Sequence, residues 1–383
     1  MRVLMVSKAC VVGMYQRKLE ELVRLPDLDL CVVVPPYWRE GARAQPLERV
    51  YTSGYQLQVL PMAFNGNYHL HFYPGLGALV RRLRPDILHL DEEPYNLATF
   101  QGMRLAQQCG ARALFFTWQN LLRRYPPPFR WIERYNLRHA ACALAGNREA
   151  IDVLRARGFR RAIHLIPQFG VDPDLYQAQP PTLRFGDAAQ TRTSRTDAPF
   201  VVGFGGRLVE EKGVQVLLRA MAGMNGDWRL RLTGDGPYLP ELESLCVQLG
   251  LRERVTVQPR APSSEVPRLL NELDALVLPS LTRRNWKEQF GRVLIEAMAC
   301  QVPVVGSSSG EIPNLIGDAG LVFPEGDAEA LRAALERLMH DAELRVTLGQ
   351  KGRARVLAHY TQRQIAVETY AVYRQLLGLA PSP

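Results

Sequence analysis

The chain has 383 residues, enough for two domains with cores of their own. Hydrophobic residues make up 47% and charged residues 22%, and no apolar run reaches the ~18 residues that span a bilayer, which excludes a protein with transmembrane helices. The net charge of +9 belongs to the first half: residues 1–170 hold 23 Lys and Arg against 13 Asp and Glu, and the remainder holds 24 against 25. This asymmetry predicts an anionic partner for the first half, such as a lipid surface, a phosphorylated acceptor or nucleic acid.

The N-terminal residues and the cysteines both favour a cytoplasmic protein. Met1–Ser7 could imitate a short signal peptide, but Lys8 interrupts it and no small-residue cleavage pattern follows. A first buried strand is therefore the better interpretation. The six cysteines are scattered, without a CxxC pair or a histidine at ligand spacing, which argues against a disulfide framework and a structural zinc site. We expect no metal and no bound cofactor.

Short apolar runs alternate with amphipathic stretches through the first half. Strands are expected at Val3–Val6, Leu30–Val34, Ile87–Leu90, Ala113–Phe116 and Ala141–Ala145. Helices are expected near 14–25, 75–83, 96–108, 129–140 and 147–157. This alternation predicts a parallel, doubly wound sheet.

An acidic run at 91–93 directly follows one of these predicted strands, and therefore lies at the ligand-binding end of such a sheet. Glu92 or Glu93 could hold acceptor hydroxyls or act as a base. The alternative is an acidic cluster at a helix N-terminus. His69 and His71 alternate with apolar residues, and could equally be surface positions on an extended segment or acceptor ligands.

A basic, aromatic helix is expected after the run Pro126-Pro127-Pro128. Its cationic and aromatic residues are Arg123, Arg124, Phe129, Arg130, Trp131, Arg134, Tyr135 and Arg138. Such a helix could lie on an anionic membrane, at the inner face of the plasma membrane. The alternative is a solvated face over a packed stripe. Nucleic-acid binding is not expected, because no stacking platform or reading helix is recognisable.

The strand–helix pattern restarts in the second half, after residues 179–199, which are expected to be a linker or exposed loop. Strands are expected at Phe200–Phe204, Trp228–Leu232, Val255–Val257, Ala275–Leu278, Pro303–Val305 and Leu321–Phe323, and late helices at 327–339, 341–357 and 361–377. We predict an α/β protein of two Rossmann-like domains that face a cleft, spanning 1–178 and 200–360. The helix within 361–378 is expected to return to the first domain.

Two glycine turns follow the first two strands of this second half. Gly206 would let the backbone approach a ligand, and Arg207 and Lys212 flank the turn, where they could converge on a pyrophosphate. The run is not GxGxxG, so the dinucleotide fingerprint is not met. Gly234-Asp235-Gly236-Pro237 makes the second turn, also at the ligand end of the sheet. Ordinary strand–helix turns with solvated charges are the alternative.

Glu288 and Glu296 lie eight positions apart around Gly291. On a helix over 290–300 that rises ~1.5 Å per residue, their carboxylates would be roughly 10–12 Å apart along the axis. That is too far for the ~5 Å carboxylate pair of a retaining glycosidase. The spacing matches the two ends of a nucleotide sugar, with the amides near Phe290 and Gly291 facing its pyrophosphate. The alternative is that Glu288 caps the helix and Glu296 is a solvated charge.

Together these motifs resemble the large retaining glycosyltransferase family four, of GT-B fold. That family combines a Gly-Arg…Lys-Gly loop, a Gly-x-Gly-Pro turn and Glu-x7-Glu, which stand here as Gly206-Arg207…Lys212-Gly213, Gly234-Asp235-Gly236-Pro237 and Glu288…Glu296. The resemblance implies metal-independent sugar transfer, with retention, from a nucleotide-diphosphate sugar to a polysaccharide, glycolipid or other glycoconjugate. A GT-B-type sugar-nucleotide epimerase or hydrolase, and a non-catalytic basic membrane scaffold, are the alternatives.

The resemblance also implies roles for single residues. Arg207 and Lys212 would bind the donor diphosphate and stabilise the charge that leaves with it. Glu296 would bind the ribose, and Glu288 would hold the sugar with the amides at the start of its helix. Gly13, in the loop after the first strand, would approach the phosphate from the other domain.

The chain departs from the family pattern at two places. Members often carry a histidine at the end of a middle strand of the first domain, where this chain reads Phe115-Phe116-Thr117-Trp118-Gln119-Asn120. Gln119 or Asn120 is expected to contact the sugar instead. The N-terminal loop Lys8–Gly13 has one glycine rather than the usual pair.

Overall fold

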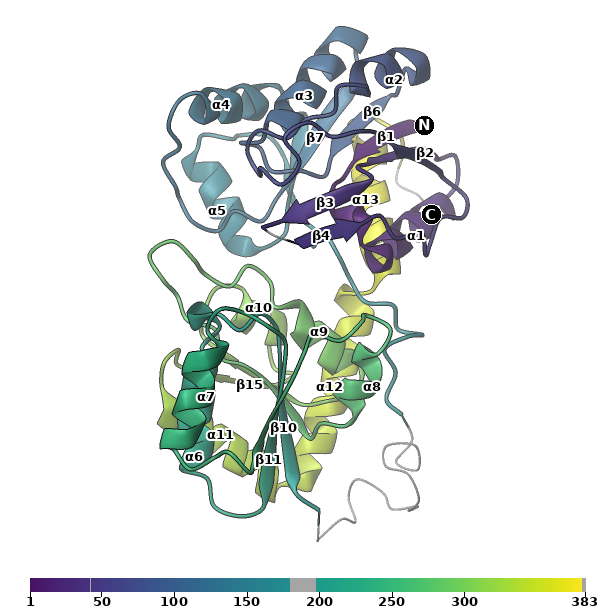
Figure 1. The fold of residues 1–383 in the computed structure, drawn as a ribbon. Coiled ribbons are helices and arrows are strands. Elements are labelled where there is room, and N and C mark those ends of the chain that lie inside the picture. The colour runs from purple at the N-terminus through teal and green to yellow at the C-terminus, as the bar shows by residue number, and fades with distance from the viewer. Residues whose placement is uncertain (42, 180–197, 381–383) are drawn as a thin grey trace. The chain divides into compact units, whose positions relative to one another are not determined.

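The computed structural model describes residues 1–41, 43–179 and 198–380. The chain forms two compact units: Met1–Gly170 with the C-terminal segment that begins at Gln362, and Val171–Thr361. Each unit is built on a parallel sheet (Figure 1). The linker predicted at 179–199 lies almost entirely outside the described residues. Within the ranges that are described, no helix is both long and apolar enough to cross a membrane.

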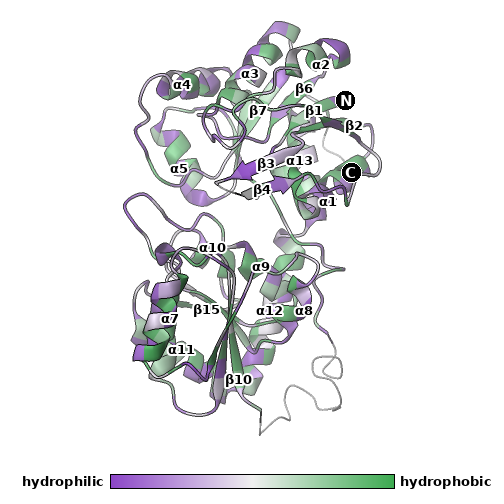
Figure 2. Cartoon of the chain, viewed as in Figure 1, coloured by the Kyte–Doolittle hydropathy of each residue, from purple (hydrophilic) through white to green (hydrophobic). Residues whose placement is uncertain are grey.

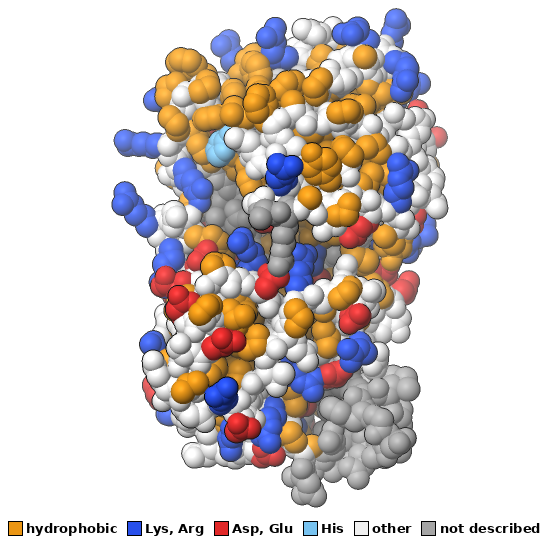
Figure 3. Space-filling model, in the orientation of Figure 1, with side chains coloured by type: hydrophobic (Ala, Val, Ile, Leu, Met, Phe, Trp, Pro, Cys, Tyr) orange, Lys and Arg blue, Asp and Glu red, His pale blue; other side chains and the backbone are white. Residues whose placement is uncertain are grey.

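The N-terminal unit holds a seven-stranded sheet in the order β5-β2-β1-β6-β7-β8-β9, with all neighbouring strands parallel. Its strands are β1 (Arg2–Val6), β2 (Asp29–Val34), β5 (Gln56–Val59), β6 (Ile87–Leu90), β7 (Arg112–Thr117), β8 (Cys142–Ala145) and β9 (Ile163–Leu165). A separate antiparallel pair consists of β3 (Tyr37–Glu40) and β4 (Arg43–Pro46). The α-helices are α1 (Arg17–Val23), α2 (Leu76–Leu83), α3 (Leu97–Cys109), α4 (Phe129–His139), α5 (Arg148–Ala156) and α13 (Gln362–Leu376). Lys and Arg side chains project from the surface of this unit (Figure 3).

Both faces of the N-terminal sheet are covered by helices, because successive strand residues point to opposite faces. Leu4 and Val6 of β1 pack in a core with apolar residues of α2, α3 and α5. Val3 and Met5 pack in a second core with α1 and α13. Burial on both faces explains why these strands read as continuous apolar runs, whereas the helices alternate in hydropathy (Figure 2).

The C-terminal helix α13 is part of the N-terminal unit, as Figure 1 shows by its yellow ribbon beside α1. Ile365, Tyr370 and Tyr373 bury their side chains in the core beside α1. The Tyr373 hydroxyl lies 2.6 Å from His89 Nδ1, which is buried on β6. A polar contact inside this core therefore fixes the register of α13 against the sheet.

The C-terminal unit holds a six-stranded parallel sheet in the order β12-β11-β10-β13-β14-β15. Its strands are β10 (Phe200–Gly205), β11 (Trp228–Thr233), β12 (Val255–Gln258), β13 (Ala275–Leu278), β14 (Val304–Ser307) and β15 (Leu321–Phe323). Its α-helices are α6 (Val214–Ala222), α7 (Leu239–Gln248), α8 (Val266–Asn271), α9 (Arg292–Ala299), α10 (Ile312–Ile316), α11 (Ala328–His340) and α12 (Ala342–His359).

The boundary between the units falls at Gly170, earlier than the residue 178 expected from sequence. The Val171 N–H donates to the Tyr360 carbonyl at 2.9 Å, within the C-terminal unit. The Tyr176 hydroxyl donates to Glu296 Oε1 at 3.2 Å. These contacts attach residues 171–176 to the C-terminal unit, although no apolar run in the sequence indicates it.

Burial lowers the pKa of His89 from 6.5 to about 4, so between these pH values the unfolded chain binds a proton there and the folded chain does not. The free energy of unfolding should therefore fall as pH drops through this window, by up to about 3 kcal/mol from this group. Urea titrations across this pH window should show that the free energy of unfolding depends less steeply on pH in His89→Gln than in the wild type. Exposed His359→Gln is the control. Equal slopes in wild type and His89→Gln would contradict the assignment.

Candidate functional site

In the C-terminal unit the strand order reverses between β10 and β13. The chain runs outward from β10 to β11 and β12, then returns to β13 and continues to β14 and β15. Open α/β sheets bind ligands beyond the carboxyl ends of their strands at such a point. The loops at this point, 206–213 and 279–291, carry most of the residues that the sequence predicted to bind a donor.

An ion pair connects these two loops. Lys212 Nζ lies 2.6 Å from Glu288 Oε2, and the Ser280 hydroxyl donates to the same oxygen at 2.7 Å. Glu288 is 6% exposed, and the Lys212 ammonium also lies 5.1 Å from the centre of the Trp286 ring. The structure thus joins two residues that were expected to have separate roles. It also shows that Glu288 is not the cap of α9, since Gly291 is in the N-cap position.

Glycines allow the backbones of these loops to touch. Gly213 has φ +71°, and a Cβ there would come within 1.9 Å of the Pro279 carbonyl oxygen. Gly310, at φ +56°, would place a Cβ 1.9 Å from the Glu288 carbonyl oxygen. Any side chain would push the loops apart, so these two glycines hold the ends of β10, β13 and β14 together.

The glycines of the second turn have the same structural role. A Cβ on Gly234 would lie 1.8 Å from the Gly206 carbonyl oxygen, and one on Gly236 would lie 2.1 Å from that of Leu208. The Leu208 N–H also donates to the Asp235 carbonyl at 2.8 Å. Backbone packing therefore accounts for Gly234 and Gly236, and their contact with a donor stays a prediction. Arg207, on the same loop as Gly206, is exposed.

Glu296 lies on the buried side of α9 rather than in solvent, so the solvated-charge alternative is wrong. Its Oε1 accepts a hydrogen bond from the Tyr176 hydroxyl at 3.2 Å and lies 3.0 Å from Arg292 Nε. Burial, and then the neighbouring Glu296 charge, raise the pKa of Tyr176, which stays a hydroxyl donor. Both contacts orient the Glu296 carboxylate from the same oxygen.

Helix α9 begins at Arg292, two residues later than the start expected near Phe290. Gly291 adopts φ +85°, a left-handed conformation that cannot continue a helix. Phe290 is buried, and its ring lies 6.1 Å from that of Tyr360. Its side chain is therefore part of the packing, and a phosphate contact through its backbone stays a prediction.

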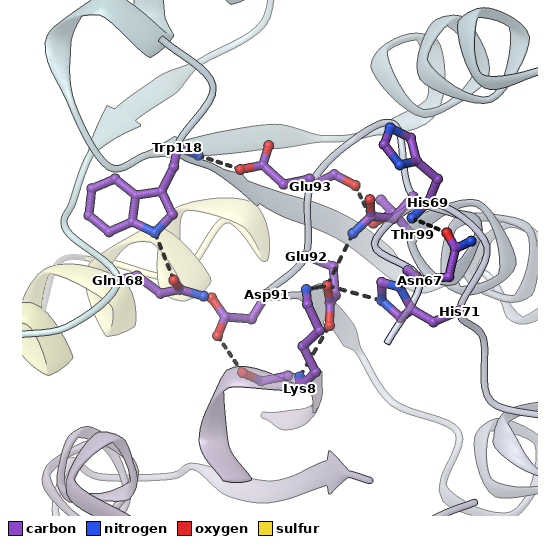
Figure 4. Close-up of polar contacts among 12 residues, drawn as sticks. Lys8, Asn67, His69, His71, Asp91, Glu92, Glu93, Thr99, Trp118 and Gln168 are labelled. Atoms are coloured by element: carbon purple, nitrogen blue, oxygen red, sulfur yellow. Dashed lines mark hydrogen bonds and ion pairs between the residues drawn. The ribbon is translucent and has the colours of Figure 1, made fainter. Parts of the chain in front are cut away.

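The N-terminal unit has an equivalent polar cluster where its own strand order reverses, between β1 and β6. Lys8 follows β1 and forms an ion pair with Glu92, which follows β6. Asn96 Nδ2 and His71 Nε2 lie 3.2 and 3.3 Å from Glu92 Oε2 (Figure 4). Burial alone would raise the pKa of Glu92, but Lys8 and His71 outweigh it and lower that pKa to about 2. Glu92 is thus a fully engaged carboxylate, and the surface alternative for His71 is wrong.

Glu93 differs from its neighbour in having no ion pair within the described part of the chain. Its carboxylate accepts bonds from the Thr117 hydroxyl at 2.6 Å and the Trp118 N–H at 2.8 Å. Burial raises the pKa of Glu93 to about 7, against the effect of these two bonds. His69 lies nearby among aromatic rings, 5.2 Å from Tyr95 between ring centres. The pKa of Glu93 is therefore near neutral, whereas that of its neighbour Glu92 is about 2.

The remaining predicted residues of the N-terminal unit have partners inside it. The Gln119 N–H donates to Thr117 Oγ1 at 3.1 Å, and Asn120 Nδ2 lies 3.3 Å from Glu149 Oε2. The Gly13 N–H donates to Glu48 Oε2 at 2.7 Å. A phosphate could reach the Gly13 amide only if it displaced Glu48. The phosphate contact of Gly13 and the sugar contact of Gln119 or Asn120 remain predictions.

Three residues of these clusters were not expected from the sequence: Ser280, Trp286 and Lys8. Ser280 and Lys8 each lie two residues beyond a buried strand, a position that could have identified them. Trp286 lies in a loop, and its contact with Lys212 depends on how that loop folds, so it leaves no local sequence signal.

Two doubly wound parallel sheets, with charged side chains at the strand ends where each order reverses, form the GT-B fold, which solved glycosyltransferase structures share. The family model "Glycosyl transferases group 1" matches residues 188–355, and "Glycosyl transferase 4-like domain" matches 12–168. The chain therefore belongs to the group 1, family-four-like glycosyltransferases.

The chain is also similar to individual named glycosyltransferases. The chain is 28% identical over 290 residues to alpha-D-kanosaminyltransferase of Streptomyces kanamyceticus, covering 74% of this chain and 73% of that enzyme. It is 32% identical over 207 residues to the GDP-mannose-dependent alpha-(1-6)-phosphatidylinositol monomannoside mannosyltransferase of Mycolicibacterium smegmatis, covering 52% of this chain and 53% of that enzyme. Among solved structures, Anabaena HepE in complex with UDP-glucose superposes with a TM-score of 0.73 at 20% identity, over 99% of this chain and 100% of that chain.

Gly213→Ala should destabilise the protein more than Gly250→Ala. Both glycines are left-handed, at φ +71° and +68°, but a Cβ at Gly250 meets nothing within 4 Å. The two variants therefore share a backbone strain of about 1 kcal/mol, and only Gly213→Ala adds a clash, which should contribute about 2 kcal/mol more. Urea unfolding measures the difference. Equal losses of unfolding free energy in the two variants would show that the contact between Gly213 and the Pro279 carbonyl is not tight.

Proposed function

We propose that the protein is a retaining glycosyltransferase that uses a nucleotide-diphosphate sugar. The observation that carries the proposal is the Lys212–Glu288–Ser280 cluster at the point where the C-terminal sheet reverses its order. A cation held by a buried carboxylate at the carboxyl ends of parallel strands suits a ligand with an anionic centre and a polyhydroxyl end. The UDP-glucose bound to HepE is such a ligand, on the same fold.

The donor would lie across the loops at these strand ends. Lys212 and the exposed Arg207 would bind the diphosphate, the lysine as a point charge and the arginine as a fork. Glu296 would accept hydrogen bonds from the ribose hydroxyls through its Oε2. Within the described residues, Tyr176 and Arg292 both contact Oε1 of Glu296, and Oε2 makes no hydrogen bond. Glu288 would hold the sugar while it orients Lys212.

In the proposed reaction, the bond between the anomeric carbon and the diphosphate oxygen breaks. A bond from that carbon to the acceptor oxygen forms on the same face, and the acceptor proton passes to the departing diphosphate. Negative charge grows on the leaving oxygens, where Lys212 and Arg207 would stabilise it more strongly than in the ground state. The positive charge comes from side chains, so EDTA should leave turnover unchanged.

The N-terminal unit would bind the acceptor. Glu93 supports this assignment, because a carboxylate with two neutral donors and no cation retains capacity to accept a bond from an acceptor hydroxyl. One named relative is a mannosyltransferase that acts on phosphatidylinositol monomannoside, which supports a glycolipid or other glycoconjugate as acceptor. We place the enzyme in the cytoplasm, in keeping with its six free cysteines.

Lys212→Ala and Glu288→Gln should each lower kcat by roughly 10²–10³-fold, because the first removes the cation at the leaving group and the second removes the carboxylate that positions it. Both should remain folded. Lys351→Ala, which removes an exposed ammonium paired with Asp318 at 3.2 Å, is the matched control and should be unaffected. Product formation from a nucleotide-sugar panel, with and without acceptor, measures the effect.

Full turnover in both variants would refute the assigned roles. Free sugar or an epimer formed at the same rate without acceptor would favour the hydrolase or epimerase alternative. Normal biological activity without any sugar transfer would favour the scaffold.

Glu93→Gln should raise the acceptor KM about tenfold and leave the donor KM unchanged, since a bond to a charged group is lost. The wild-type kcat/KM for acceptor should rise as pH increases through 7, because burial raises the pKa of Glu93 to about 7 and the carboxyl group loses its proton there, against the lowering effect of the Thr117 and Trp118 bonds and of Lys8 and with a smaller raising effect of Glu92. The glutamine variant should not show this rise. An unchanged acceptor KM, or the same pH profile in both proteins, would remove Glu93 from the acceptor site.

A further inference from the structure

Helix α4 has one packed face and one solvent face. Ile132, Glu133 and Asn136 are buried against the unit. On the opposite face, Trp131 is 64% exposed and is accompanied by the exposed arginines Arg130, Arg134 and Arg138. The indole of Trp131 is therefore mostly in solvent, on the same face of α4 as these arginines.

The segment around α4 is rich in arginine and poor in acidic residues. Glu133 is the one acidic residue in the sequence from 121 to 147, and it is buried and paired with Arg157 at 3.0 Å. Helix α3, which packs on α4, and helix α2 beyond it contain no Asp or Glu. Their exposed arginines are Arg81, Arg82 and Arg104. Figure 3 shows Lys and Arg side chains projecting along this part of the unit.

A second apolar side chain lies beside this charge. Leu122, in the segment that leads into α4, is 62% exposed. The rings beneath the start of α4 are packed: Phe129 lies 4.8 Å from His69, and Tyr125 lies 4.7 Å from Tyr95, between ring centres. The two exposed apolar groups, Leu122 and Trp131, therefore project from an anchored segment rather than from a loose loop.

We propose that this surface, formed by Leu122, Trp131 and the arginines of α2, α3 and the 123–138 segment, docks on an anionic phospholipid bilayer. Cations at the headgroup level with an indole and an aliphatic chain between them match the interfacial region of a bilayer. A nucleic acid or an anionic glycan would use the cations and leave Trp131 and Leu122 in water. The proposal is independent of the chemistry assigned to the C-terminal unit.

Cosedimentation of the full-length protein with vesicles tests the proposal. The vesicles contain phosphatidylglycerol with phosphatidylcholine, or phosphatidylcholine alone. Arg130→Gln with Arg134→Gln should weaken binding to the anionic vesicles roughly 30-fold, at about fivefold for each charge near the surface. Arg219→Gln with Arg252→Gln removes the same charge from exposed positions of the C-terminal unit and should bind like the wild type.

The apolar contribution has its own matched pair. Leu122→Ser with Trp131→Ser should weaken binding and abolish the blue shift of tryptophan fluorescence that vesicles produce in the wild type. Val247→Ser, at a valine that is 61% exposed on α7, should change neither. The proposal is overturned if anionic vesicles do not bind the wild type, or if heparin or DNA binds while vesicles do not. It is also overturned if Arg219→Gln with Arg252→Gln weakens vesicle binding as much as Arg130→Gln with Arg134→Gln.

Discussion

The ion pair between Lys212 and Glu288 determines how the loops at the ligand end of the C-terminal sheet are arranged. It links the loop after β10 to the loop after β13, the two strands between which the sheet order reverses. Gly213 on the first of these loops, and Gly310 after β14, let the backbones meet at Pro279 and at Glu288 itself, so the charged pair is held by packed main chain. A cation fixed in this way is oriented before any ligand arrives, which is what electrostatic stabilisation of a leaving group requires.

The N-terminal unit repeats the arrangement with a different outcome. There too a lysine after the first strand, Lys8, pairs with a glutamate after the strand across the reversal, Glu92. His71 and Asn96 complete the shell around that glutamate and leave it little capacity for a ligand. The adjacent Glu93 accepts bonds from two neutral donors, the Thr117 hydroxyl and the Trp118 N–H. Glu93 rather than Glu92 therefore keeps the capacity to accept a hydrogen bond from a ligand.

Much of the fold follows from the sequence, because strands buried on both faces are continuous apolar runs. The strands β5 and β9 escaped prediction, since they are short and only partly buried. The pairing of Lys212 with Glu288 could not be read from the chain: the residues are 76 positions apart and meet only because β10 lies beside β13. Gly234 and Gly236 show another limit, since close approach to a ligand and contact with another backbone both require the absence of a Cβ.

Binding of nucleoside diphosphates to the Lys212–Glu288 site can be measured without either the sugar or the acceptor. Thermal unfolding of the wild type and of Lys212→Ala should be followed with UDP, GDP and ADP over a range of concentrations. If Lys212 binds the diphosphate, one of these nucleotides should raise the wild-type Tm in proportion to the logarithm of its concentration. The Lys212→Ala variant should lose most of this shift. Equal stabilisation of both proteins, or none by any nucleotide, would contradict this role of Lys212.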